Sequence, residues 1–306
     1  MTGEILTLRN FRGDSLVFGT SSIHLLAHDG LGLAPVQRVT QEGPYQHGAT
    51  QVNARLAPRV ITLSLAMVRD DNWNTDWLYR NALTDMLNDI DHELYLDVTL
   101  PTFFLTASTV RMNVHYLDSL TMPRAGEHDG FDRSVLQLIA HDPVWYDPNP
   151  EVVTMDVTAG GEGLMVDMEI PFGLGGTVVD ETTQFLYPGT WFSYPIIKIT
   201  GPIENPVLTA YSIEGGTATV KLDFTGTTIA AGAYYEIDCR YGYKTVKDNS
   251  GTNKIGDLTA DSDLASFVIA PHPYFQDGAN QFTLTGINAT NATSCTVTYY
   301  NRYIGI

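Results

Sequence analysis

The chain has 306 residues and a formal net charge of −18, because 35 Asp and Glu stand against 17 Lys and Arg. So acidic a composition argues against a nucleic-acid-binding protein, which would show a basic face, and no apolar run reaches the roughly 18 residues that a membrane-spanning helix needs. A charged share of only 17%, with 27 Gly, 15 Pro and 16 Tyr, indicates a β-rich protein with many turns and length for two domains.

The first 150 residues predict a set of β-strands interrupted by one helix. Period-two alternation is clearest at residues 59–68, where Ile61, Leu63, Leu65 and Met67 would share one face. The other strands expected in this half are residues 5–8, 15–18, 22–26, 93–99, 103–107, 110–117 and 134–139.

The one helix is expected at residues 75–90. Apolar side chains recur there at helical spacing, from Trp77 and Leu78 through Leu83 to Ile90. That spacing is typical of a helix with one buried face and one face in solvent.

Residues 36–58 are mostly polar and contain turn signals at Gly43, Pro44 and Gly48. Valines and a tyrosine distributed along this stretch still favour extended structure. We therefore expect a hairpin arm that is buried on neither face. Because an isolated two-stranded hairpin is marginally stable in water, such an arm needs a neighbour.

Residues 135–150 predict the boundary between the two domains. An apolar run is followed there by Trp145, Tyr146 and three prolines within eight residues, which end a sheet and stiffen the chain. We expect domains at 1–148 and 149–306, with the two aromatic side chains packed between them. The alternative is an ordinary proline-rich loop inside one large domain.

The second half predicts an all-β sandwich of jelly-roll or galectin-like type, without a helix of useful length. Cys239 and Cys295 are far apart and cannot form a disulfide framework, so buried free thiols are expected. The strands of this second half are expected at residues 152–157, 182–186, 196–199, 207–211, 217–224, 234–239, 244–246, 266–269, 281–286 and 296–300.

No motif nominates a catalytic, cofactor-binding or metal site. The chain has no P-loop, Gly-x-Ser-x-Gly or dinucleotide-binding fingerprint. The acidic run at residues 257–263 lacks the glycine and final glutamate of a calcium-binding hand. The sequences that could contribute metal ligands fall in or beside expected loops, where solvated side chains are the simpler interpretation: Asp91-His92-Glu93, His128-Asp129 and His141-Asp142.

Aromatic residues of the second half could stack on sugars if they line one exposed face. The alternative is that they form a sandwich core or contact another subunit. These residues are Trp191, Phe192, Tyr194, Tyr241, Tyr243, Tyr274 and Phe275.

The order of these elements resembles the distal tail protein (Dit) family of long-tailed bacteriophages, over nearly the whole chain. The resemblance rests on the polar arm leading into residues 59–68, the helix at 75–90, and the sequence H-D-P-V-W-Y at 141–146. It continues with Y-P-I-I-K-I-T-G-P-I-E-N-P at 194–206 and Y-E-I-D at 235–238.

The resemblance implies a structural virion protein at the distal end of the tail, made in the host cytoplasm. Members form a ring, usually a hexamer, that joins the tail tube to the tail tip or baseplate and leaves a channel for DNA. The first domain would build the ring, and a galectin-like second domain would hold tip or receptor-binding proteins. No enzyme activity, cofactor or membrane insertion is implied; the alternative function is a carbohydrate-binding module.

Subunit contacts are expected in the first domain. Residues 1–150 contain ten Arg and no Lys, whereas all five Lys lie after residue 190. Arginine offers a rigid fork for carboxylates, which suits ion pairs between subunits. The alternative is a bias of composition without a role at an interface. The residues expected at interfaces are Arg38, Tyr45 and Arg55 of the arm, Arg59 of the strand after it, and Trp145 and Tyr146 of the junction.

Overall fold

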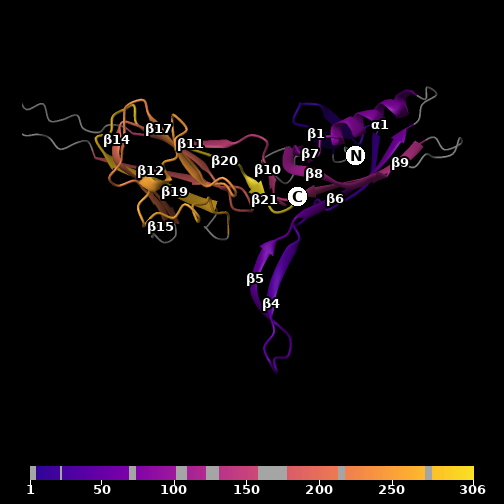
Figure 1. Ribbon diagram of the computed structural model, residues 1–306, viewed down its shortest axis with the longest axis horizontal. Helices are drawn as coiled ribbons and strands as arrows, with labels where there is room; N and C mark the ends of the chain where they lie inside the picture. The colour runs from indigo at the N-terminus through magenta and orange to yellow at the C-terminus, as the bar shows by residue number, and fades with distance from the viewer. Residues whose placement is uncertain are drawn as a thin grey trace, which may run out of the picture. The chain divides into compact units, whose positions relative to one another are not determined.

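A computed structural model describes residues 5–20, 23–68, 74–100, 109–121, 131–157, 178–212, 218–272 and 278–306 (Figure 1). The chain forms two compact units. The first unit comprises Met1–Pro148 and Arg302–Ile306, and the second comprises Asn149–Asn301. Residues 302–306, here called the returning segment, therefore belong to the first unit. The expectation that the second domain runs to residue 306 is wrong, because strand pairing returns these residues to the first unit.

The first unit is built on a nine-stranded antiparallel sheet. Its main strand order is β2-β1-β7-β8-β9-β6-β3, and β10 pairs with both β8 and β21. The strands are β1 (Ile5–Arg9), β2 (Ser15–Phe18), β3 (Ile23–Asp29), β6 (Arg59–Val68), β7 (Leu94–Thr99), β8 (Thr109–Thr121), β9 (Phe131–Ala140), β10 (Trp145–Tyr146) and β21 (Arg302–Tyr303).

The long strand β8 links the two halves of this sheet. Its first half pairs with β7, from Thr109 onward, and its second half pairs with β9, beginning at His115. Buried side chains from both halves belong to one hydrophobic cluster. The predicted alternation of β6 is confirmed, since Ile61, Leu63 and Leu65 are fully buried.

Helix α1 (Asn74–Leu87) packs on this core and confirms the predicted helix, although it ends before residue 90. Leu83, Met86 and Leu87 are buried, whereas Leu78 is 65% exposed. The apolar stripe seen in the sequence is thus wider than the face that packs, because the sheet covers only one side of the helix.

Strands β4 (Val36–Gln41) and β5 (Thr50–Leu56) pair only with each other and form the hairpin, which projects from the sheet of the first unit (Figure 1). Every residue of β4 is exposed, and so is every residue of β5 except the partly exposed Leu56. The prediction of an arm that is buried on neither face is confirmed.

The second unit is a sandwich of two five-stranded antiparallel sheets around its own hydrophobic cluster. One sheet has the order β11-β20-β13-β17-β18; the other has the order β12-β19-β14-β15, with β16 beside β14. The strands are β11 (Glu151–Asp156), β12 (Val179–Leu186), β13 (Ile196–Thr200), β14 (Ile203–Ser212), β15 (Ala218–Asp223), β16 (Thr228–Ile229), β17 (Tyr234–Asp238), β18 (Thr245–Asp248), β19 (Ala279–Ile287) and β20 (Ser294–Tyr299).

The mainly β architecture predicted from the sequence is confirmed. Residues 266–269 are an exception, because only Ile269 pairs there, in an isolated bridge with Ser193. A short 3-10 helix, η1 (Ile255–Asp257), interrupts the loop after β18. The strand expected at residues 103–107 lies outside the described residues.

Candidate functional site

The hairpin presents two arginines that carry no carboxylate partner within the described residues. Arg38 Nη1 donates to Gln51 Oε1 at 2.6 Å, and Arg55 Nε donates to Gln37 Oε1 at 3.0 Å. Both acceptors are neutral amides, so they orient the guanidinium groups without neutralising them. Two positive charges therefore remain available to carboxylates of another chain.

The tip and the sides of the hairpin expose apolar surface as well. Tyr45 is fully exposed and adopts a left-handed backbone conformation (φ 68°) in the turn. Val36, Val39 and Val52 are also exposed on the strands. Exposed tyrosine and arginine are the side chains that most often dominate binding energy at protein interfaces. The hairpin is accordingly the best candidate for an assembly surface in this chain.

The base of the hairpin is organised by Arg59, the first residue of β6. Arg59 is only 1% exposed. Its Nη1 lies 3.0, 2.7 and 2.6 Å from the carbonyl oxygens of Gly30, Leu31 and Gly32, and its Nη2 donates to the carbonyl oxygen of Ile304 at 2.8 Å.

No carboxylate within the described residues pairs with Arg59, and its Nε has no hydrogen-bond partner there. Burial lowers the pKa of Arg59 to about 10, which still leaves it charged at neutral pH. The backbone carbonyl dipoles therefore solvate the cation in place of water.

Trp145, in strand β10, packs beside Arg59 and binds one of the same carbonyl groups. It is fully buried in the core of the first unit, and its Nε1 donates to the carbonyl oxygen of Leu31 at 3.1 Å. The Arg59 guanidinium carbon lies 5.8 Å from the centre of the indole ring. The cation and the indole thus share Leu31 as a common acceptor.

These positions correct part of the sequence prediction. Arg59 and Trp145 were expected at interfaces, but the first unit covers both side chains completely. Tyr146 is partly buried in the same unit, pairs with Arg302 in β21 and hydrogen-bonds Asn113 through its hydroxyl. The expectation that Trp145 packs between two domains is wrong, because the core of the first unit supplies its contacts.

The returning segment has almost no signature in the sequence. Strand β21 is two residues long, and short strands leave no periodic pattern to detect. The contacts of Arg59 are mostly with backbone carbonyl groups. Because every residue has such a group, the residue types at these positions do not indicate that they bind a cation. The one available signal was the R-Y-I-G-I sequence at 302–306, whose apolar and aromatic residues are out of place in a solvated loop.

In the second unit, the acidic side chains of residues 257–263 form hydrogen bonds and an ion pair with neighbouring residues. Asp257 Oδ2 accepts a hydrogen bond from the Tyr235 hydroxyl at 2.6 Å. Burial, and then this hydrogen bond, raise the pKa of that tyrosine. The side chain of Asp263 accepts from the Ser266 amide, and hydrogen bonds from Ser266 lower the pKa of Asp263.

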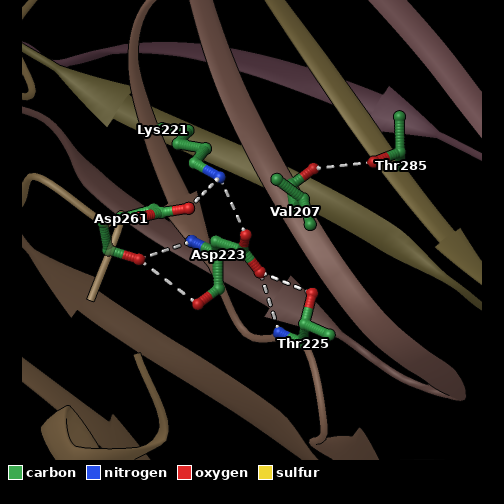
Figure 2. A network of polar contacts seen from close by, with 7 residues as sticks. Val207, Lys221, Asp223, Thr225, Asp261 and Thr285 are labelled. Carbon is green, nitrogen blue, oxygen red and sulfur yellow. Dashed lines mark hydrogen bonds and ion pairs between the residues drawn. The ribbon is translucent and has the colours of Figure 1, made fainter. Parts of the chain in front are cut away.

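Asp261 contributes to a network at the edge of β15 (Figure 2). Lys221 lies between Asp223 at 3.0 Å and Asp261 at 3.5 Å, while the hydroxyl of Thr225 donates to Asp223 at 2.6 Å. Burial disfavours the charged form of Asp223, but the hydrogen bonds from Thr225 and Lys221 outweigh it and lower its pKa. These contacts hold a loop against the strand edge.

No group of three or more potential metal-ligating side chains occurs among the residues that the structure describes. Asp142 forms an ion pair with Arg302, and His92 lies 2.9 Å from Asp89. His128-Asp129 falls outside the described residues. The two cysteines are free and buried, as predicted, and burial raises the pKa of Cys239 and of Cys295 to about 12.

The aromatic residues considered for sugar stacking separate into two groups. Trp191, Phe192 and Tyr194 are partly buried, whereas Tyr241 and Tyr243 are 71% and 61% exposed on the turn between β17 and β18. A buried core role is therefore wrong for these two tyrosines. Tyr274 and Phe275 lie outside the described residues.

Side-chain contacts connect the turn that carries the two exposed tyrosines to the rest of the second unit. Tyr241 packs edge-on against Tyr194, with ring centres 4.7 Å apart. Lys244 Nζ lies 5.4 Å from the centre of the Tyr241 ring and donates to the carbonyl oxygens of Leu264 and Ala265 at 3.1 and 3.0 Å. These contacts hold the Tyr241 ring and the Lys244 side chain against neighbouring segments of the second unit.

No helix within the described part of the chain is long and apolar enough to cross a membrane. No protein-family model matches the sequence, and a search of curated proteins finds no match.

Solved structures give a full-length match. The Dit protein of phage SPP1, described as a paradigm of the hub adsorption apparatus in phages that infect Gram-positive bacteria, aligns with a TM-score of 0.62 at 14% identity, covering 97% of this chain and 98% of that one. A chain of the phage P2 baseplate in its activated conformation aligns with a TM-score of 0.47 at 11% identity, covering 100% of both chains. Over nearly its whole length, the chain therefore has the fold of a phage distal tail protein.

Proposed function

We propose that the protein is a structural component of a phage tail and assembles with copies of itself into a ring, of six subunits by family resemblance, through the first unit. The observation that carries this proposal is the hairpin, which leaves the charges of Arg38 and Arg55 unpaired and buries neither face. The shared fold with the SPP1 Dit protein supports the same conclusion.

In this proposal the hairpin of one subunit lies on an acidic surface of the next. The chain supplies such surfaces in excess, because its net charge is −18 and the described hairpin strands contain no Asp or Glu. Arg38 and Arg55 gain carboxylate partners on assembly, and Tyr45 with the exposed valines gains apolar contacts. Buried charge pairs of this kind fix the register of an interface as well as adding affinity.

The ring joins the tail tube to the tip or baseplate at the distal end of the tail, and its second unit faces tip or receptor-binding proteins. DNA passes through the ring without specific binding, because an acidic lining repels phosphate. We propose no catalytic role.

The test is a charge reversal on the hairpin. Arg38→Glu together with Arg55→Glu should weaken self-assembly by at least about a hundredfold, since each close interfacial charge pair contributes on the order of 1.5 kcal/mol or more. Assembly is measured by light scattering after size-exclusion chromatography, and by electron microscopy of tails made with the variant.

The matched control reverses two exposed lysines of the second unit, Lys198→Glu and Lys247→Glu. It changes the net charge by the same amount. If the hairpin variant assembles like the unaltered protein, the hairpin does not carry the interface. If both variants fail alike, the effect is one of total charge.

A second candidate function is saccharide binding by the second unit. Tyr241 and Tyr243 favour it, because they present two exposed rings on one turn whose Tyr241 and Lys244 side chains contact neighbouring segments. In the full chain, Tyr241→Ala with Tyr243→Ala should abolish binding of cell-wall oligosaccharides in a calorimetric titration. Tyr45→Ala, which removes an exposed tyrosine from the first unit, serves as the control. Absence of heat at millimolar sugar for the unaltered protein would exclude this candidate.

A further inference from the structure

We propose that the returning segment, residues 302–306, is a latch that fixes the base of the hairpin, so that the hairpin is held for subunit contact only after the second unit has been made. The role of the hairpin in subunit contact rests on the proposed function. The latch itself rests on contacts within the first unit, and it can be tested without assembly.

One carbonyl oxygen in the returning segment binds both legs of the hairpin. Ala34, two residues before β4, donates its amide to the oxygen of Ile304 at 3.0 Å. Arg59, three residues after β5, donates Nη2 to the same oxygen at 2.8 Å. The two legs also bond each other, since the Ala57 amide donates to the Pro35 carbonyl oxygen at 2.8 Å. Ile304 therefore closes the base at the point where the hairpin leaves the sheet.

The segment that presents Ile304 is itself anchored in the first unit. Tyr303 pairs with Trp145 and Arg302 with Tyr146 across β21 and β10. The Tyr303 side chain is 1% exposed, and its hydroxyl donates to Asp147 at 3.3 Å. Arg302 forms an ion pair with Asp142. The Ile304 oxygen is thus held by strand pairing and a buried aromatic ring.

The contact is close enough to require glycine on the returning segment. A Cβ atom on Gly305 would lie 2.8 Å from the carbonyl oxygen of Gly32 and 3.0 Å from the amide nitrogen of Leu33. By contrast, a Cβ on Gly32 would meet nothing within 4 Å. The two sides of this contact therefore differ in their tolerance of a side chain, which provides a matched pair of substitutions.

Without the returning segment, the base would lose its shared acceptor. Arg59 would keep the carbonyls of residues 30–32 but lose Ile304, and its buried charge would be less well solvated. The hairpin has no buried face of its own to compensate. Its direction is therefore set at the base.

The order of synthesis determines when the base of the hairpin can be fixed. Residues 36–59 are synthesised early, but the returning segment follows the whole second unit, residues 149–301. Because domains fold from the N-terminus during synthesis, the first unit can collapse long before Ile304 is present. A partial chain then has a loosely held hairpin and does not compete for a place in the assembly.

The experiment measures the hairpin base directly by hydrogen exchange and by spin-label distances. Gly305→Ala is compared with Gly32→Ala, in the full chain. Labels on Ser15→Cys and His47→Cys report the hairpin direction, while the buried Cys239 and Cys295 stay unlabelled. For Gly305→Ala we expect the Ala34 and Ala57 amides to exchange at least about tenfold faster, a broadened distance distribution and reduced assembly. Gly32→Ala should match the unaltered protein.

Unchanged exchange at Ala34 and Ala57 in Gly305→Ala would overturn the latch, and so would an equal effect of Gly32→Ala. If Gly305→Ala fails to fold, Arg59→Lys takes its place, because a lysine cannot bind Ile304 and the residues 30–32 carbonyls together. The reversal Arg38→Glu with Arg55→Glu separates the two proposals. It should weaken assembly by at least about a hundredfold with hydrogen exchange at the hairpin base unchanged, whereas a latch variant changes both.

Discussion

Arg59 is a buried cation of the first unit whose guanidinium contacts backbone carbonyl oxygens and no carboxylate of the described residues. An arginine immediately after a polar arm suggested an exposed, interface-forming side chain. The structure buries it because the loop at residues 30–32, Trp145 of β10 and the returning segment converge on its guanidinium. A residue's type predicts what it can bind, whereas its burial depends on which segments meet around it.

Trp145 makes a prediction at this scale. Trp145→Ala should lower the free energy of unfolding of the first unit by about 3–5 kcal/mol, because it removes a fully buried indole and leaves a cavity. It should also free the carbonyl of Leu31 that the indole binds. Urea unfolding followed by signals assigned to each unit measures this. A loss confined to the second unit would contradict the placement of Trp145 in the core of the first.

The buried thiols predict a dependence on alkaline pH. Cys239 and Cys295 have a pKa of about 12 in the folded protein, raised by burial from 9.0. Between about pH 9 and 12 the unfolded chain releases protons that the folded chain retains, so the stability of the second unit falls as pH rises. Each thiol contributes a slope of at most about 1.4 kcal/mol per pH unit.

Urea midpoints of the second unit between pH 8 and pH 10.5 measure this slope. In Cys295→Ala the midpoint should fall less steeply with pH than in the unaltered protein, whatever the effect of the substitution at pH 8. Equal slopes in the two proteins would contradict the role of Cys295. Neither thiol should react with a thiol reagent at pH 8 until the protein is unfolded.

At the scale of elements, the hairpin is the clearest example of local sequence determining local structure. Its polar composition and turn residues indicated a structure without a buried face, and β4 and β5 have none apart from the partly exposed Leu56. The helix was also predicted, but its exposed Leu78 was assigned to the buried face. Periodicity defines a stripe on a helix; the width of the sheet beneath determines how much of it is covered.

Removing the hairpin should leave the first unit folded. Replacing residues 37–55 by a short Gly-Ser turn removes no side chain of the hydrophobic cluster, since none of these residues belongs to it. The free energy of unfolding should change by less than about 1 kcal/mol, as loop length has a weak effect on stability. Self-assembly should be lost. Near-ultraviolet circular dichroism and urea titration test the first expectation, and light scattering tests the second.

At the scale of the whole molecule, net charge bears on the proposed self-assembly. Chains of charge −18 repel one another, and salt screens that repulsion over a Debye length of about 10 Å at 0.1 M. Raising the salt concentration from roughly 0.02 to 0.15 M should therefore favour self-assembly, even though it weakens the ion pairs proposed for Arg38 and Arg55. Sedimentation at several salt concentrations measures the balance. Assembly that weakens steadily across this range would show that those ion pairs outweigh the repulsion.

The sequence by itself determined the elements and the broad class of this protein. Alternation along β6, the helical stripe and the frequent turn residues are local properties, and local spacing is what decides whether a segment can bury one face. The division after residue 148 also left a local trace, in the prolines that end the sheet. The order of these elements then sufficed for a resemblance to distal tail proteins.

Only the tertiary structure decided where the ends of these elements meet. The pairing of β21 with β10, the contact of Arg59 with the Ile304 carbonyl and the hydrogen bond from Trp145 to Leu31 join residues more than a hundred positions apart. Such contacts depend on backbone geometry and on shared burial, neither of which leaves a periodic pattern in the chain. For the same reason, the exposure of Arg38, Tyr45 and Arg55 could be predicted from the arm itself, whereas the enclosure of Arg59 could not.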